Sequence, residues 1–167
     1  MSYFLTRKDH TNNITRKLLF AGSKTVTYCW FVAFLFLQAC SGGPEPIHYG
    51  KDGCDFCKMI IVDSHFGAEL VTSKGKIYKF DSIECMIHYF RQNSGLNIVS
   101  ALMLVTDHSR PGEMIDARKA GYLVSEKLPS PMGASLSAFI HADSLHANLM
   151  RFGGQSMQWE ELLHVIK

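Results

Sequence analysis

Three sulfur-containing side chains within a six-residue run give this 167-residue chain its most distinctive chemistry. Cys54 and Cys57 are separated by two residues, Met59 follows, and the apolar run 60–62 comes directly after. Thiolates and thioethers are soft ligands, and a mixed set of Cys and Met favours Cu(I) over Zn(II). If residues 58–62 form a strand, Cys57 and Met59 lie on one face of it, so both sulfur atoms can reach one ion. The run therefore predicts a Cu(I) site.

The pair formed by Cys54 and Cys57 permits other interpretations. In a thioredoxin-type redox site such a pair opens a helix, whereas the residues after Cys57 are typical of a strand. A structural zinc site needs four ligands, and the sequence has neither a second Cys-Xaa-Xaa-Cys motif nor a His pair to complete one. A structural disulfide between Cys54 and Cys57 is the remaining alternative.

Further donors are available for a copper site. Met132 lies in a predicted turn, 130–133, that presents a thioether on a constrained loop, and Cys54 is expected near the mouth of the site. Imidazole donors are offered by His88, His141 and His146. Cys85 falls off the apolar stripe of its predicted helix, and buried packing is the usual role of such a cysteine. The sequence shows no Gly-rich phosphate loop, Ser/His/Asp order or paired carboxylates, so no enzyme class is indicated.

The first 39 residues are typical of a lipoprotein signal peptide. Five basic residues precede a 12-residue uncharged run from Val26 to Leu37, a length that suits a signal-peptide core better than a membrane span. The run leads into Leu-Gln-Ala-Cys40, which matches the bacterial lipobox and predicts cleavage before Cys40 and lipidation of its thiol. Residues 40–52, rich in Gly and Pro, are then expected to form a flexible lipidated tether. Ser41, in place of Asp, favours an outer-membrane address that faces the periplasm.

Removal of this leader changes the charge balance. The leader carries five of the 17 basic residues and one of the 15 acidic residues, which leaves twelve basic and fourteen acidic residues in 40–167. A nucleic-acid-binding protein needs a basic surface, so the mildly acidic mature chain is not expected to bind nucleic acid. Once Cys29 is removed and Cys40 is lipidated, three thiols remain, and an odd number leaves at least one of them unpaired.

The mature chain predicts an α+β fold with two small modules, 53–98 and 99–167. The expected strands are 58–62, 68–72, 76–80, 98–105, 121–125, 137–142 and 156–159. The expected helices are 82–92, 144–152 and a short one at the C-terminus. Asp81 and Asp143 are placed as N-caps, and the two strand-to-helix units repeat at an offset of 62 residues. This repeat favours two related modules, although Asp-Ser caps are common enough to recur by chance.

Several separate motifs occur in the order that they have in the NosL family. They are Cys54-Asp-Phe-Cys57-Lys-Met59, Phe66-Gly67-Ala68, the segment from Gly75 to Met86, Ser130-Pro131-Met132-Gly133, and the closing Gly153-Gly154 with Trp159-Glu160. Over residues 50–160 the chain thus resembles this family of membrane-anchored copper-binding lipoproteins. The resemblance implies two ββα-type modules with a fold related to organomercurial lyase. It also implies a Cu(I) chaperone that supplies the catalytic copper–sulfide centre of nitrous oxide reductase, together with a membrane ABC-type transporter complex.

The resemblance also implies site residues. In the family, the Cys and Met of a Cys-Xaa-Met element bind copper, and these positions are Cys57 and Met59 here. Many members have Gly between them, where this chain has Lys58. The third ligand is not fixed by the resemblance, and Met132 and Cys54 are the candidates. We therefore expect a protein that is not an enzyme, is anchored through its lipidated N-terminal cysteine, and passes one Cu(I) ion to the apo-reductase or to the transporter complex. An envelope thiol–disulfide oxidoreductase that uses Cys54 and Cys57 is the alternative.

Overall fold

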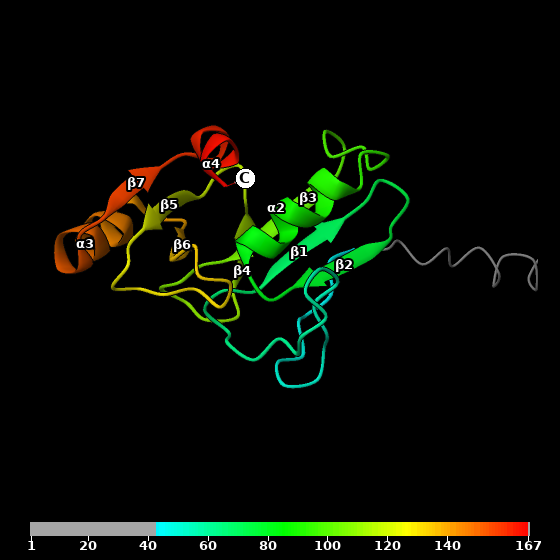
Figure 1. Cartoon of the computed structure of the whole chain (residues 1–167), viewed down its shortest axis with the longest axis horizontal. Helices are drawn as coiled ribbons and strands as arrows, with labels where there is room; N and C mark the ends of the chain where they lie inside the picture. The colour runs from blue at the N-terminus through cyan, green and yellow to red at the C-terminus, as the bar shows by residue number, and fades with distance from the viewer. Residues whose placement is uncertain (1–42, 167) are drawn as a thin grey trace, which may run out of the picture. The chain divides into compact units, whose positions relative to one another are not determined.

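The computed structural model describes residues 43–166, so the predicted signal peptide and the lipidation site at Cys40 lie outside the described residues. The described part of the chain forms two antiparallel sheets, each with a helix inserted in its path (Figure 1). The predicted α+β class is confirmed. Within residues 43–166, each helix is too short or too polar to cross a membrane.

The first sheet begins with the predicted hairpin, formed by β1 (Ala68–Val71) and β2 (Ile77–Phe80). Strand β3 (Leu102–Thr106) pairs with the other side of β1, and β4 (Met114–Asp116) extends the sheet to the order β2-β1-β3-β4. Helix α2 (Ile83–Gln92) connects β2 to β3 and packs on the hairpin. Its apolar stripe, predicted from the sequence, is buried. Its N-cap is Ser82 and not the predicted Asp81, since the Ser82 hydroxyl accepts a hydrogen bond from the Cys85 N–H.

The second sheet follows the same path with shorter strands. Strands β5 (Gly121–Val124) and β6 (Leu136–Phe139) form a hairpin, helix α3 (Ala142–Phe152) follows, and β7 (Gln155–Met157) returns beside β5. The strand order is β6-β5-β7, and helix α4 (Trp159–Val165) contacts β5. In both sheets the first strand of the hairpin lies between the second strand and the strand that follows the helix.

This repeated path supports two related modules but corrects their alignment. Phe80 and Phe139 each end the second strand of a hairpin, and each pairs with the first residue of the strand beside it, Ala68 or Gly121. Positions 80 and 139 differ by 59 residues, so the predicted offset of 62 is wrong. Asp143 accordingly lies inside the first turn of α3 and is not its N-cap, a position that His141 takes.

One hydrophobic core contains side chains from both sheets. It includes Leu70 and Tyr122, and burial of side chains of this size contributes about 1.5–3 kcal/mol each. At the far end of α2, the Arg91 guanidinium donates hydrogen bonds to the carbonyl oxygens of Leu163 and Ile166, at the end of the chain. The passage from the first sheet to the second lies between β4 and β5, whereas the sequence analysis placed the module boundary at residues 98 and 99.

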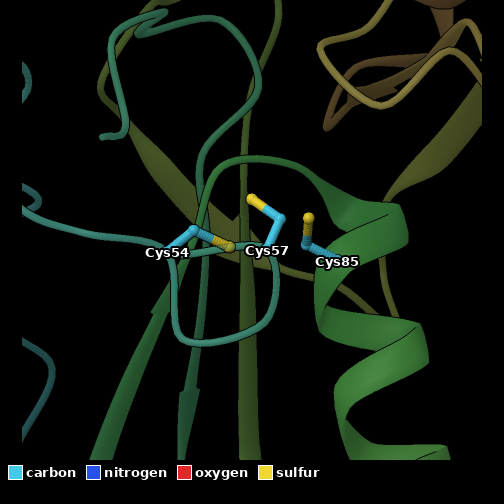
Figure 2. Close-up of side chains that lie close together, drawn as sticks. All are labelled: Cys54, Cys57 and Cys85. Atoms are coloured by element: carbon cyan, nitrogen blue, oxygen red, sulfur yellow. The ribbon is translucent and has the colours of Figure 1, made fainter. Parts of the chain in front are cut away.

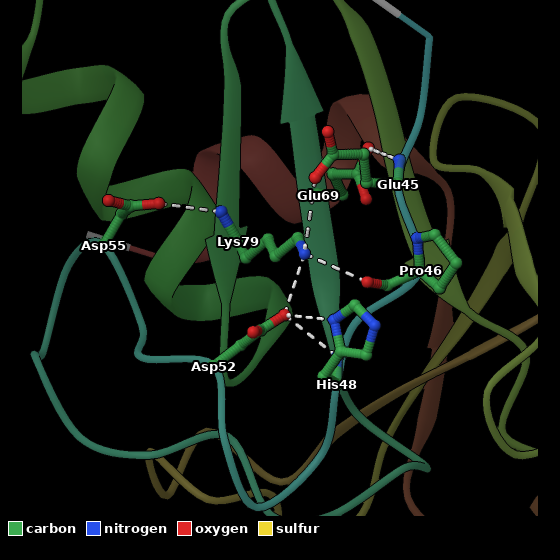
Figure 3. Close-up of polar contacts among 7 residues, drawn as sticks. All are labelled: Glu45, Pro46, His48, Asp52, Asp55, Glu69 and Lys79. Carbon is green, nitrogen blue, oxygen red and sulfur yellow. Dashed lines mark hydrogen bonds and ion pairs between the residues drawn. The ribbon is translucent and has the colours of Figure 1, made fainter.

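Residues 45–52, which we expected to belong to a flexible tether, are fastened to the first sheet by a polar network (Figure 3). Lys79 of β2 donates from its ammonium group to the Asp52 carboxylate at 2.8 Å. The Glu45 N–H donates to the buried carboxylate of Glu69 at 3.1 Å. These contacts fix the segment that leads into the cysteine run.

Candidate metal centre

Three cysteine sulfur atoms lie together where a loop meets the first turn of α2 (Figure 2). Cys54 and Cys57 come from the loop, and Cys85 comes from the helix. The three sulfur atoms lie within 4.8 Å of one another, and all three are free thiols. Cys54 is 2% exposed and Cys85 is 0% exposed, whereas Cys57 is only partly buried. Among residues 43–166, this is the one group of three or more His, Cys, Asp or Glu side chains with such spacing.

The segment 52–60, called here the cysteine loop, is a tight turn. The Cys54 N–H donates to the Met59 carbonyl at 2.8 Å, and the Lys58 N–H donates to the Cys54 carbonyl at 3.0 Å. Lys58 closes the turn with a φ of 65°, in the left-handed region that few side chains adopt. The turn directs the two cysteines of the loop toward α2.

The strand predicted at 58–62 is wrong, because these residues contribute only an isolated bridge, between Ile60 and Gly53. A continuous apolar run predicts a strand buried on both faces. Here Ile61 enters the core, while Ile60 and Val62 are exposed. The argument that placed Cys57 and the neighbouring thioether on one strand face therefore does not apply.

The cysteine loop is attached to two elements of the first sheet. The Asp55 N–H donates to the Lys79 carbonyl at 2.8 Å, and the Lys79 N–H donates to the Asp55 carboxylate at 2.8 Å. On the side of α2, the Phe56 ring stacks on His88 with the ring centroids 5.4 Å apart. The loop is thus held by β2 and by the helix that carries Cys85, and these contacts bring the three thiols together.

The electrostatics of the cluster favour one thiolate. A hydrogen bond from the Cys85 thiol lowers the pKa of Cys54 to about 5, and backbone N–H groups of three neighbours act in the same direction. These neighbours are Asp81, Cys57 and Phe56. Burial raises the pKa of Cys57, and donation to Cys54 raises the pKa of Cys85. At neutral pH the metal-free cluster therefore holds one thiolate beside two thiols.

A buried carboxyl group adds to the negative character of this region. Burial, followed by the nearby Cys54 charge, raises the pKa of Asp81. Its Oδ1 atom is buried and has no hydrogen-bond partner among the described residues. Like charges in a poorly solvated place destabilise one another, so a cation bound by the thiols would relieve this repulsion.

The predicted metal ligands have different positions in the structure. Cys54 and Cys57 belong to the cluster, as expected for ligands of one ion. Met59 follows closely in the chain, but its side chain is 63% exposed. Met132 is also exposed; the hydroxyl of Ser130, at the start of its turn, donates to a carboxylate of α2.

The histidines considered as third ligands lie outside the group of three thiols. His88 stacks on the loop through its ring, and His141 and His146 are exposed on α3 or at its start. Cys85 is the site residue that the sequence analysis assigned to packing. The odd number of thiols in the mature chain was the available signal, but the sequence gives no distance between the loop and the helix.

Clustered thiols can bind a soft metal ion or form a disulfide. A structural zinc site takes a fourth ligand, which the group lacks among the described residues. A catalytic redox thiol needs a low pKa together with access for its substrate. Here the thiol with the lowered pKa, Cys54, is buried, while the accessible Cys57 has a raised pKa. The arrangement therefore suits a soft metal ion better than disulfide exchange.

Comparison with known proteins identifies the family. The NosL family model matches residues 47–165. The copper-binding lipoprotein NosL of Stutzerimonas stutzeri is 30% identical over 126 residues, which cover 71% of this chain and 66%, just under two thirds, of that relative. The crystal structure of the copper chaperone NosL from Shewanella denitrificans matches with a TM-score of 0.60 and 21% identity, over 72% of this chain and 95% of the other, and supports the fold. The chain belongs to the NosL family.

Proposed function

We propose that this protein is a lipid-anchored Cu(I) carrier of the cell envelope, which supplies copper for maturation of the catalytic centre of nitrous oxide reductase. The observation that carries this proposal is the group of three free thiols within 4.8 Å of one another. Soft thiolate ligands select Cu(I). The names of two relatives, a copper-binding lipoprotein and a copper chaperone, agree with that cargo. The role is carriage and not catalysis.

A carrier must hold its ion and still release it to a partner. Cys57 is the accessible thiol of the group, while Cys54 and Cys85 are buried. A sulfur donor of a partner protein can therefore approach the ion at Cys57 and replace the protein ligands one at a time. The exposed thioether of Met59 provides a neutral soft donor at the mouth, where it assists this exchange.

The proposed site of action follows from the N-terminal sequence. Lipidation of Cys40 would tether the domain to the membrane, with the outer membrane favoured by Ser41, and the copper site would face the periplasm. Two acyl chains are enough for stable anchoring. The partners would be the ABC-type transporter complex of reductase maturation, the apo-reductase, or both.

Anaerobic titration of the soluble domain with Cu(I), against a chromophoric chelator, tests the cargo. We expect Cys57→Ser to abolish tight binding and Met59→Leu to weaken it. Met150→Leu is the matched control, because Met150 is also exposed, at 74%, but lies on α3. Unchanged affinity in Cys57→Ser would overturn the proposed function.

The maturation role is tested in cells that make nitrous oxide reductase. A strain without this protein should contain a reductase with less copper in its catalytic centre, and the unchanged protein should restore the copper content. Cys40→Ala should leave the domain in the soluble periplasmic fraction and restore the reductase poorly. A fully loaded reductase in the deletion strain would contradict this role.

An envelope thiol–disulfide oxidoreductase is the second candidate, because two thiols of the group are close and one has a lowered pKa. A reduction assay with a disulfide substrate separates the two candidates. The carrier is expected to show no turnover, since the Cys54 thiolate is buried. Turnover that is lost in Cys54→Ser would favour the oxidoreductase.

A further inference from the structure

Cys85 lies on a different element from the other two thiols, yet its sulfur is part of the same group. We infer that Cys85 is the third copper ligand, so that Cys54, Cys57 and Cys85 hold the ion in a three-thiolate site at the start of α2. This inference deepens the proposed function and rests on it. It assigns the retention of the ion to the buried thiols and leaves Met59 outside the resting site.

The spacing of the sulfur atoms fits a three-coordinate ion. A metal–sulfur bond of about 2.3 Å places three sulfur atoms around a trigonal ion about 4 Å apart. The three sulfur atoms lie within 4.8 Å of one another, so side-chain rotations and small shifts bring them to bonding distance. Neither the loop nor the helix has to be rebuilt.

Both elements that supply the ligands are already fixed. The Cys85 N–H donates to the Ser82 hydroxyl at 3.3 Å, which sets the first turn of the helix. The stacked rings of Phe56 and His88 join the loop to the same helix. A site with ligands held in place before binding loses less conformational entropy when the metal arrives.

The surroundings can stabilise the negative charge of three thiolates around one monovalent ion. Backbone N–H groups of Asp81, Cys57 and Phe56 donate to the Cys54 sulfur, and the Met59 N–H donates to the Cys57 sulfur. The first turn of α2 adds the positive end of a helix dipole. These donors replace the water that buried thiolates lose.

Burial divides the three ligands by role. Cys54 and Cys85 are shielded from solvent, so a partner or chelator cannot reach them before it has displaced Cys57. Cys85 thus slows the loss of the ion, while Cys57 remains the point of exchange. Removal of Cys85 should weaken retention but leave a two-coordinate site that still delivers copper.

The test compares Cys85→Ala and Cys85→Ser with Met86→Leu, which removes the neighbouring buried sulfur of α2 and keeps all three thiols. The alanine variant is included because an unpaired buried hydroxyl can destabilise a fold, and circular dichroism verifies each variant. We expect both Cys85 variants to bind Cu(I) at least about tenfold more weakly, or 1.4 kcal/mol, with unchanged affinity in Met86→Leu. X-ray absorption of the Cu(I)-loaded domain should count three sulfur ligands in the unchanged protein and in Met59→Leu, and two in Cys85→Ala.

A count of three sulfur atoms in Cys85→Ala, or unchanged affinity in both Cys85 variants, overturns the inference. That result leaves the proposed function intact if Cys57→Ser still abolishes binding. If Cys57→Ser also binds normally, the proposed function fails with it. The two failures are therefore distinguishable.

Discussion

Asp55 and Lys79 hold each other by a reciprocal pair of hydrogen bonds, each 2.8 Å long. Asp55 lies between the two thiols of the cysteine loop, and Lys79 lies on β2, an edge strand of the first sheet. The ammonium group of Lys79 also bonds Asp52, just before the first cysteine. The position of the thiols therefore depends on a strand that is distant from them in sequence.

Lys79→Met tests this attachment, because it removes the ammonium group and keeps the backbone bonds to Asp55. The Asp52 carboxylate loses its cation, so we expect the free energy of unfolding to fall by about 1–2 kcal/mol. Chemical denaturation of the metal-free domain measures the change. Lys119→Met is the control, since the exposed pair of Lys119 and Asp116 at 3.5 Å should contribute less than about 0.5 kcal/mol. Equal losses in both variants would contradict the attachment.

The left-handed backbone of Lys58 predicts an unusual effect of glycine. Lys58→Gly and Lys58→Ala both lose the bond from the Lys58 ammonium group to the Asp55 carbonyl, so they differ only at the backbone. A residue with a Cβ atom at a φ of 65° costs about 1 kcal/mol relative to glycine. The glycine variant should be more stable than the alanine variant by about that amount in thermal or chemical unfolding. If the alanine variant is as stable, the turn has another conformation in solution.

The lowered pKa of Cys54 predicts a pH dependence of the metal-free protein. Its pKa of about 5 in the fold lies below the ordinary value of 9.0. The stabilisation from its thiolate is therefore complete above pH 9.0, decreases as the pH falls, and is absent below about pH 5. Ultraviolet thiolate absorbance should show a transition near pH 5 that is missing in Cys54→Ser. A transition that persists in this variant would assign the thiolate to another cysteine.

The second sheet depends on a glycine with no room for a side chain. Gly154 has a φ of 105°, and a Cβ atom there would lie 2.1 Å from the Val124 carbonyl oxygen. Gly154→Ala should lower the free energy of unfolding by about 3 kcal/mol or more, from strain and displacement of β7. Gly95→Ala should change it by less than about 0.5 kcal/mol, because its Cβ atom meets nothing within 4 Å. Similar stabilities of the two variants would contradict the packing of β7.

The sequence predicted the elements that local patterns define. The first hairpin and α2 follow from alternating apolar residues, a Gly-containing turn and a capped apolar stripe, and the structure has them near the predicted bounds. Strand β4 was missed because three residues are too few to show a period. The strand at 58–62 was predicted wrongly because an apolar run does not reveal that Ile60 and Val62 face solvent.

The candidate site was predicted only where its residues are neighbours in the chain. Cys54 and Cys57 could be identified from their spacing and residue type. Cys85 could not, because its approach to the loop depends on the contacts of Lys79 and Phe56, which are long-range in sequence. A helix carrying one cysteine is ordinarily a packed helix, so sequence reasoning chose the commoner role.

The bonds from Arg91 to the carbonyl oxygens of Leu163 and Ile166 couple the copper helix to the last residues of the chain. One end of that helix carries a thiol of the metal group, and the other end is anchored by the C-terminal turn. The two halves should therefore melt in one cooperative step, with equal calorimetric and van't Hoff enthalpies. Deleting the final turn would loosen a ligand that lies near the opposite end of the domain sequence.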